Sequence, residues 1–180
     1  MISAALAVLQ TEGEQIELSR FYSLYSKRLY AIAYSKLHNK QDAEDAVQEL
    51  FLRIANKPEK FFSLEDNKRV AYADVIIRNI SIDAFHARNK VTVTELSEEI
   101  STDEFEISLE DNVLGEISKS ELLKFIETLP LLQQDVLTLH SMLELSNAEI
   151  ADSLHISETA VRQRLFLARK SILDYIENRR

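Results

Sequence analysis

SNAEIADSLHISETAVRQRLFLARK, residues 146–170, contains two signals for the start of a helix with a short turn between them. Ser146 is followed three residues later by Glu149, the spacing of a capping box, in which each side chain bonds the backbone N–H group of the other residue. This box opens the short helix AEIADSL. Residues 155–157 then form a tight turn, and the serine that ends the turn caps a longer helix reaching towards residue 176. A seven-residue helix, a three-residue turn and a longer helix are the proportions of a helix-turn-helix motif.

The longer helix has a locally basic surface. No Asp or Glu occurs between Thr159 and Ile172. The basic residues in that interval are Arg162, Arg164, Arg169 and Lys170. The outer face near the helix N-terminus, where a recognition helix meets base edges, carries Thr159, Arg162, Gln163 and Phe166. Arg and Gln offer the donors and acceptors that read guanine and adenine in the major groove. The alternative is a solvated basic helix in a structural hairpin, but the spacing of the two helices favours DNA binding.

Composition points to helices throughout the chain. The 180 residues include only two Gly and two Pro, too few to punctuate many hairpins, and 46% are hydrophobic, which is ample for a core. No Cys is present, so disulfides, thiol catalysis and thiolate metal sites are excluded. The N-terminus has a short apolar run without a basic start, and it fits neither a signal peptide nor a membrane span. We therefore expect an all-α protein in the cytoplasm.

The remaining helices are predicted from periodicity and capping signals. In the first helix we expect an inward stripe of Phe21, Leu24, Tyr25, Leu29, Ile32, Ala33 and Leu37. Asn39 caps a second helix that stops before Pro58. Ser63 and Asp66 predict a capping box that opens a third helix through residue 87. A further box starts at Ser118, and Pro130 separates the next two helices.

The acidity of the chain is concentrated in one segment. The net charge is −9, and residues 94–121 alone carry ten acidic residues and one lysine. The flanking regions are nearly neutral. We therefore predict a helical bundle over residues 1–93, a flexible acidic linker over 94–120 and a helix-turn-helix domain over 121–180. The linker is either a solvated tether or a polyanion that occupies a basic channel or shields a basic surface.

Two exposed faces of the N-terminal bundle are candidate contact surfaces. The second helix turns acidic and amide groups around Leu52 away from its apolar stripe, which would suit a basic, partly apolar partner helix or a merely solvated face. In the third helix Tyr72, Ile76, Asn79 and Asp83 fall on one line, with basic groups nearby at Lys68, Arg69 and Arg78. Such a Tyr could stack on a base, or it could belong to the core.

The order of these pieces resembles the bacterial sigma-70 family, in its extracytoplasmic-function group, which keeps only regions two and four. The resemblance covers nearly all of residues 18–176 and rests on DAEDAVQELFLRI (42–54), VIIRNISIDAFHARNK (75–90) and LPLLQQDVLTLHSMLELSNAEIADSLHISETAVRQRLFLARKSI (129–172), with the acidic segment between the second and third. Three positions depart from the family pattern. The basic run after Asp83 is diluted, Gln134 stands where Arg is usual, and His155 stands where a turn Gly is usual, which requires a positive φ.

The resemblance implies three surfaces. The residues that would dock on the clamp coiled coil of the largest polymerase subunit are Asp42, Glu44, Asp45, Gln48, Glu49 and Leu52. Melting and reading the minus-ten element falls to Tyr72, Arg78, Asn79, Asp83 and Arg88, beside the basic Lys68 and Arg69. Reading the minus-thirty-five duplex falls to Ser157, Glu158, Thr159, Arg162, Gln163 and Arg164, with Arg169 and Lys170 further along the same helix. The acidic linker would thread near the active-site channel of the polymerase.

The resemblance implies an alternative sigma factor that binds core RNA polymerase and directs it to promoter DNA, and that is commonly held by an anti-sigma factor. A stand-alone helix-turn-helix regulator, with the bundle as a dimerisation or sensing module, is the alternative. An enzyme is not expected, because the four histidines lack metal-ligand spacing and the chain has neither a Gly-rich phosphate loop nor a nucleophile motif. We expect no metal, no cofactor and no small-molecule substrate.

Overall fold

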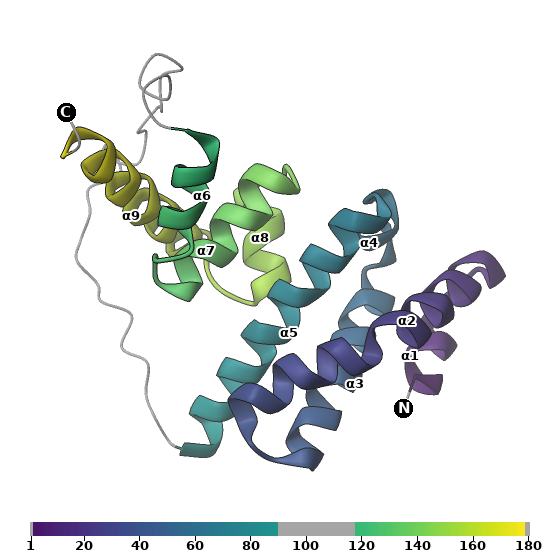
Figure 1. Ribbon diagram of the computed structural model, residues 1–180. Coiled ribbons are helices and arrows are strands. Elements are labelled where there is room, and N and C mark those ends of the chain that lie inside the picture. The colour runs from purple at the N-terminus through teal and green to yellow at the C-terminus, as the bar shows by residue number, and fades with distance from the viewer. Residues whose placement is uncertain (1, 90–117, 179–180) are drawn as a thin grey trace. The chain divides into compact units, whose positions relative to one another are not determined.

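The computed structural model describes residues 2–89 and 118–178 and divides the chain into two compact units, residues 1–94 and 95–180 (Figure 1). Every regular element within the described residues is a helix, as the all-α prediction requires. Most of the predicted acidic linker lies outside the described residues. The hypothesis that it acts as a polyanion therefore concerns residues outside the described ranges.

The first unit is a bundle of α1 (Ser3–Val8), α2 (Glu12–Leu37), α3 (Lys40–Asn56), α4 (Pro58–Ser63) and α5 (Asp66–Asn89). The long helices α2, α3 and α5 pack against one another, α1 packs mainly on α3, and α4 lies at the N-terminal end of α5 (Figure 1). The centre is fully buried and contains Leu18, Leu29, Leu50, Phe51 and Ile77. Burying side chains of this size is the main stabilising term of such a bundle, about 1.5–3 kcal/mol each.

Several local predictions for this unit are confirmed. The Asn39 side chain accepts from the Asp42 backbone N–H group at 3.1 Å and caps α3, which ends at Asn56 before Pro58. The residues that form the apolar stripe of α3 are all buried: Ala43, Val47, Leu50, Phe51 and Ile54. The turn between α2 and α3 is made by His38, which adopts a left-handed conformation with φ 50°.

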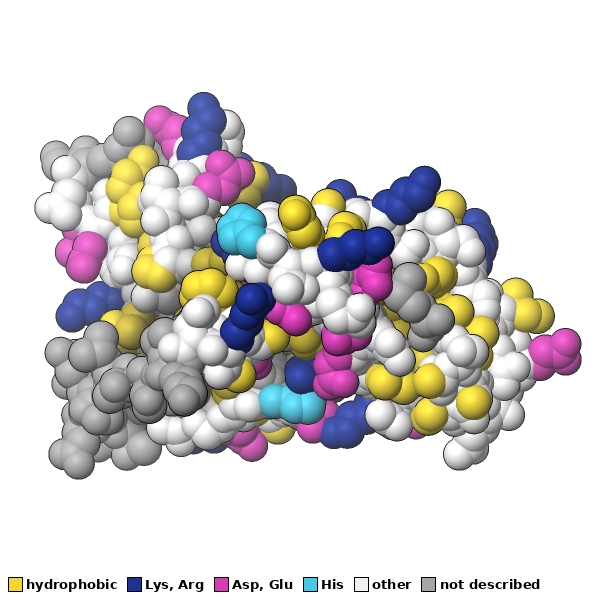
Figure 2. All heavy atoms as spheres, turned by 90° about the horizontal axis from the view of Figure 1, so that it is seen from below, with side chains coloured by type: hydrophobic (Ala, Val, Ile, Leu, Met, Phe, Trp, Pro, Cys, Tyr) yellow, Lys and Arg dark blue, Asp and Glu magenta, His cyan; other side chains and the backbone are white. Residues whose placement is uncertain are grey.

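Three predictions were wrong or incomplete. Leu24 does not belong to the inward stripe of α2, because it is 62% exposed. It is one of several large apolar side chains that are exposed. Figure 2 shows hydrophobic side chains, in yellow, on the face that it draws. Ser63 does not open α5, because it is the last residue of α4 and its hydroxyl donates to the carbonyl oxygen of Lys60. The short apolar run at the N-terminus forms α1, which sequence reasoning did not predict.

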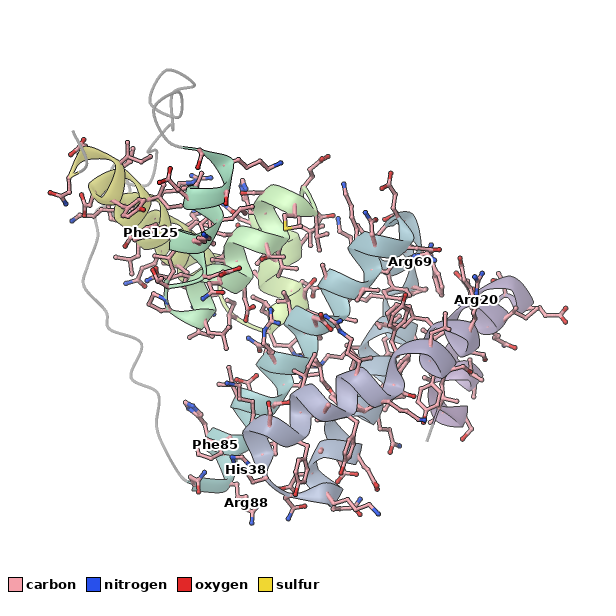
Figure 3. All side chains as sticks on the ribbon, in the orientation of Figure 1. Arg20, His38, Arg69, Phe85, Arg88 and Phe125 are labelled. Carbon is pink, nitrogen blue, oxygen red and sulfur yellow. The ribbon has the colours of Figure 1, made fainter. Side chains whose placement is uncertain are left out.

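The second unit contains α6 (Lys119–Ile126), α7 (Leu131–Leu137), the π-helical segment η3 (Thr138–Met142), α8 (Asn147–Leu154) and α9 (Glu158–Glu177). Its apolar core includes Leu129, Ala168, Ile172 and Ile176, covered in part by Leu122, Phe125, Ile126 and Leu137. Phe125 of α6, labelled in Figure 3, stacks on Tyr175 of α9 with ring centroids 4.0 Å apart. The long helix α9 thus forms one wall of the whole unit.

The predicted helix boundaries of this unit hold. Ser118 and Glu121 form the complete capping box of α6, and Pro130 precedes α7. Gln134, at the position where the related family usually has Arg, donates from Nε2 to the carbonyl oxygens of Glu127 and Leu129 at 3.1 and 2.7 Å. An uncharged amide therefore satisfies carbonyls that the end of α6 leaves without helical partners.

Candidate functional site

The helix-turn-helix motif forms as its capping signals predict. Ser146 and Glu149 make both bonds of the capping box, with 3.3 Å from the Glu149 backbone nitrogen to the Ser146 hydroxyl and 2.8 Å from the Ser146 nitrogen to the Glu149 carboxylate. His155 closes α8 in the left-handed region, with φ 55° and ψ 42°. Ser157 then caps α9 by accepting from the Ala160 backbone nitrogen at 3.1 Å. Both helix ends at the turn are thus fixed by local hydrogen bonds.

The core under the turn holds α8 against α9. The buried side chains at this contact are Ile150, Ala151, Leu154, Val161 and Leu165, and Ile156 is half-buried. Because they take up the inner faces of both helices, the polar residues at the start of α9 are left on the outer side.

That outer side carries most of the residues predicted to read duplex DNA. Ser157, Glu158, Thr159, Arg162 and Lys170 are exposed, whereas Gln163, Arg164, Phe166 and Arg169 are half-buried. Arg162 pairs with Glu158 one turn earlier, at 2.9 Å, and both side chains remain about half exposed. An exposed pair of this kind is worth at most about 1 kcal/mol, so Arg162 can exchange the carboxylate for another acceptor at little cost.

Arg169 lies near a second titratable group of the same unit. His140, in η3, has its pKa lowered from the usual value, first by burial and second by the positive charge of Arg169. Burial and the neighbouring positive charge thus both favour the neutral form of this imidazole.

The acidic face of α3 is present but is tied to neighbouring cations and amides. Asp45 is exposed, and the other predicted docking residues Asp42, Glu44, Gln48, Glu49 and Leu52 are half-buried. Glu49 accepts from Arg53 at 2.8 Å and Asp45 from Gln41 at 3.0 Å. These partners lie on α3 itself, one turn away, so they leave the face open to a second molecule.

Asp42 differs, because its partner comes from another helix. The Arg88 guanidinium, near the end of α5, donates to the Asp42 carboxylate at 2.8 Å. Figure 3 labels Arg88, near the end of α5, and His38, at the turn that precedes α3. One ion pair thus joins a residue predicted to bind polymerase to a residue predicted to bind DNA. Because the two residues are 46 positions apart, no local sequence pattern indicated that they would pair.

The predicted minus-ten residues are distributed along α5. Lys68, Tyr72 and Arg78 are half-buried, Asp83 and Arg88 are exposed, and Asn79 is buried. The Tyr72 ring contacts the ring of Phe61 in α4, with centroids 6.3 Å apart. Tyr72 is thus supported from one side by a fully buried aromatic side chain, a contact that the spacing of residues did not predict.

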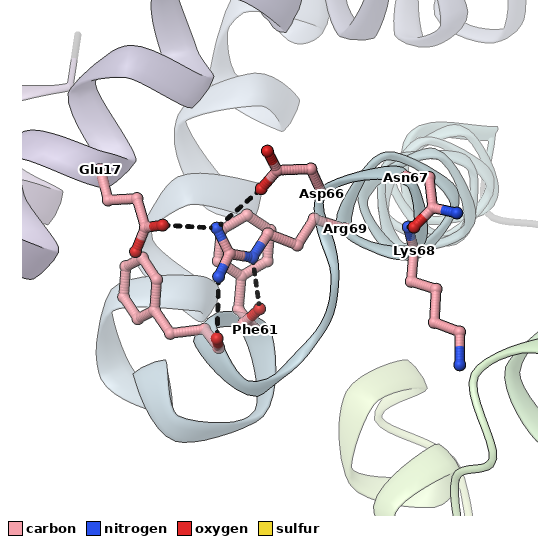
Figure 4. Close-up of polar contacts among 7 residues, drawn as sticks. Glu17, Phe61, Asp66, Asn67, Lys68 and Arg69 are labelled. Carbon is pink, nitrogen blue, oxygen red and sulfur yellow. Dashed lines mark hydrogen bonds and ion pairs between the residues drawn. The ribbon is translucent and has the colours of Figure 1, made fainter.

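Arg69 requires a correction. It was expected among the DNA-binding cations, but it is 9% exposed and its guanidinium is bonded inside the fold (Figure 4). Nη1 donates to Glu17 at 2.7 Å and to Asp66 at 3.3 Å. Nε and Nη2 donate to the carbonyl oxygens of Phe61 and Phe62, at 3.1 and 2.8 Å. With its nitrogen atoms engaged in this way, Arg69 is excluded from the proposed DNA surface.

A second ion pair between helices was also missed. Arg28 of α2 donates from Nε and Nη2 to both carboxylate oxygens of Asp74 in α5. This bidentate hydrogen bond, and then the charge of Asp74, raise the pKa of Arg28. No sequence pattern relates these two residues, which become neighbours only when α2 and α5 pack.

Family comparisons match both units. Residues 21–91 match the model of sigma-70 region 2, and residues 119–172 match that of sigma-70 region 4. The chain belongs to the sigma-70 family. The family positions coincide with the two structural units, and the region 4 match spans the whole helix-turn-helix motif.

Three curated relatives are each named "ECF RNA polymerase sigma factor". The chain is 32% identical to "ECF RNA polymerase sigma factor BldN" of Streptomyces coelicolor over 153 residues, which are 83% of this chain and 56% of the relative. It is 24% identical to SigE of Mycolicibacterium smegmatis, covering 94% of this chain and 66% of that one, and 26% identical to SigM of Bacillus subtilis, covering 86% and 92%. The chain therefore spans less than two thirds of the length of the first two relatives.

Within residues 2–89 and 118–178, no group of three or more His, Cys, Asp or Glu side chains could hold a metal ion. None of the helices in these ranges is both long and apolar enough to span a membrane.

Proposed function

We propose that this chain is an alternative sigma factor, a non-catalytic subunit that binds core RNA polymerase and directs it to promoter DNA. The observation that carries the proposal is the pairing of two units in one chain. A region 2 bundle with an acidic face on α3 precedes a region 4 helix-turn-helix whose α9 presents Arg162 and Thr159. A stand-alone regulator would use the second unit but would leave the face of α3 without a role.

In this proposal the two units have different tasks. The α3 face, centred on Asp45 and Gln48, docks on the clamp coiled coil of the largest polymerase subunit. The first turns of α9 read the minus-thirty-five element as duplex, in the geometry of a recognition helix. The α5 surface, with Tyr72, Arg78 and Asp83, captures unstacked bases of the minus-ten element, which offsets a cost of a few kcal/mol for each base taken out of the stack.

We propose that the chain acts in the cytoplasm and that an anti-sigma factor is a further partner, since the exposed faces of α3 and α9 are the surfaces such an inhibitor must cover. No small-molecule substrate and no cofactor is needed for this function. When a candidate inhibitor is added to the purified chain, binding to polymerase and binding to duplex DNA should be lost together, because the inhibitor covers both the α3 face and the α9 face.

The first experiment is co-migration of the purified chain with bacterial core RNA polymerase in size-exclusion chromatography at moderate salt. The variant Asp45→Lys with Gln48→Lys changes the net charge of the α3 face by +3 and should abolish co-migration. The matched control is Gln10→Lys with Glu12→Lys, which adds the same charge at two exposed positions of the same unit. Unchanged affinity of the first variant would contradict the docking assignment. Tight binding of the free chain to a palindromic duplex without polymerase would instead favour a stand-alone regulator.

A further inference from the structure

The buried guanidinium of Arg69 links several helices of the first unit. It makes four hydrogen bonds to three helices: Glu17 in α2, the carbonyl oxygens of Phe61 and Phe62 in α4, and Asp66 in its own helix α5 (Figure 4). The guanidinium carbon also lies 5.6 Å from the centroids of both phenylalanine rings. Since α4 has only six residues, these contacts account for much of what fixes its placement.

The two carbonyl groups explain why this position needs a planar cation. Phe61 and Phe62 stand in the last turn of α4, where backbone carbonyls lack the usual partner four residues later, although the Phe61 oxygen also accepts from the Leu64 backbone N–H group at 3.3 Å. A guanidinium can bond both of them along one edge and a carboxylate along the other, because its donors form a rigid fork. Glu17 and Asp66 supply the negative charge that lets the cation stay buried.

This cluster also supports Tyr72. Phe61, whose carbonyl oxygen accepts from Arg69 Nε, is 1% exposed, and its ring contacts the ring of Tyr72 at 6.3 Å between centroids. Tyr72 lies three residues after Arg69 on α5, so α4 and Tyr72 are held on the same part of that helix. Movement of α4 would remove the support on which the Tyr72 ring rests.

We infer that Arg69 and Glu17 are positioning residues for promoter opening: they fix α4 so that Tyr72 is held ready to stack on an unpaired base. The inference rests on the proposed function, and it assigns Arg69 a role through Tyr72 instead of a contact with DNA phosphate. Loss of the network should lower promoter opening while leaving polymerase affinity unchanged, since the α3 docking face is not part of it.

The test uses holoenzyme assembled from core polymerase and full-length chain. The probe is a duplex selected by the wild-type holoenzyme from a random-sequence library, with 2-aminopurine in the segment that opens. Glu17→Gln keeps the length of the side chain but removes its charge, and Glu17 is about half exposed, so this variant folds. We expect it to lower the equilibrium constant for promoter opening about threefold to tenfold. This loss corresponds to part of the free energy that stacking of a base on one aromatic ring contributes. Arg69→Lys, which keeps the charge but not the fork, should lower it further.

The decisive measurement is a double-mutant cycle with Tyr72→Ala. If Arg69 and Glu17 act through Tyr72, Glu17→Gln has no further effect on opening in the Tyr72→Ala background. The matched control is Arg28→Gln, which breaks the other ion pair between α2 and α5 without touching α4, and it should leave opening within about twofold of wild type.

Either of two results would overturn the inference: equal lowering by Glu17→Gln with and without Tyr72, or no lowering in the wild-type background. Failure of the wild-type chain to bind polymerase or to open any selected duplex would instead reject the proposed function, so the two failures are distinguishable.

Discussion

Replacing His155 with Gly should stabilise the helix-turn-helix unit. His155 ends α8 with φ 55° and ψ 42°, and its backbone N–H group bonds the carbonyl oxygens of Ala151 and Asp152. A non-glycine residue in this conformation places Cβ close to the following carbonyl oxygen, at a cost of roughly 1–2 kcal/mol. Its side chain is exposed, so the substitution removes little packing.

The gain is reduced by the unfolded state. Glycine loses more backbone freedom on folding than other residues, roughly 0.5–1 kcal/mol relative to Ala. The difference leaves a net stabilisation of about 0.5–1 kcal/mol. For a unit of this size, 1 kcal/mol corresponds to a shift of about 4–8 °C in the unfolding midpoint.

Differential scanning calorimetry of the full-length chain measures this shift in the transition of the second unit. His155→Ala is the control, because it removes the imidazole but retains Cβ, and its midpoint should stay near that of wild type. His38→Gly offers a contrast in the first unit: it also relieves a positive φ, but it loses the edge contact between the His38 and Tyr34 rings. A lower midpoint for His155→Gly, or an equal rise for His155→Ala, would refute the argument from backbone strain.

Three further predictions concern single contacts. Ser146→Ala removes the N-cap of α8 and should destabilise the second unit by about 1 kcal/mol in the same calorimetric assay. The control variant Ser141→Ala should not lower the stability of this unit. The lowered pKa of His140 means that the unfolded chain binds a proton at a pH where the folded chain does not. The free energy of unfolding should therefore be highest above pH 6.5, the usual pKa of the group, and fall as the pH is lowered below it. NMR titration of the His140 ring should show protonation at lower pH than for a free histidine. Arg88→Gln frees the Asp42 carboxylate and should strengthen polymerase binding slightly while weakening promoter binding, as measured by titration of each; equal weakening of both would contradict the reasoning.

Local signals predicted the C-terminal unit well because each helix end there is set by residues close in sequence. The Ser118 and Ser146 boxes, the Ser157 cap and the break at Pro130 all act over three or four residues, and the structure confirms each. The positive φ of His155 was also foreseen, since the turn geometry demands it whichever residue is present.

The first unit was predicted less completely because its polar contacts join distant residues. Arg69 looked like a surface cation in a basic, amide-rich stretch. Only folding brings Glu17, 52 residues earlier, within 2.7 Å of it. The same holds for Arg28 with Asp74 and for Arg88 with Asp42, each separated by 46 residues. Periodicity identifies which face of a helix is buried, but it does not say which charges meet across that face.

These ion pairs bear on how a chain with a net charge of −9 would bind a polyanion. Arg28, Arg69, Arg88 and Arg162 are each within 3.3 Å of a carboxylate of the same chain. Each phosphate contact adds about −0.9 to the slope of log affinity against log salt, but a cation that already neutralises a carboxylate releases fewer counterions when it turns to a phosphate. Free chain should therefore bind DNA weakly. Docking of the α3 face on polymerase would occupy the Asp42 carboxylate and release Arg88. Polymerase, which brings the chain to DNA, would thereby also free the Arg88 guanidinium to bind a DNA phosphate.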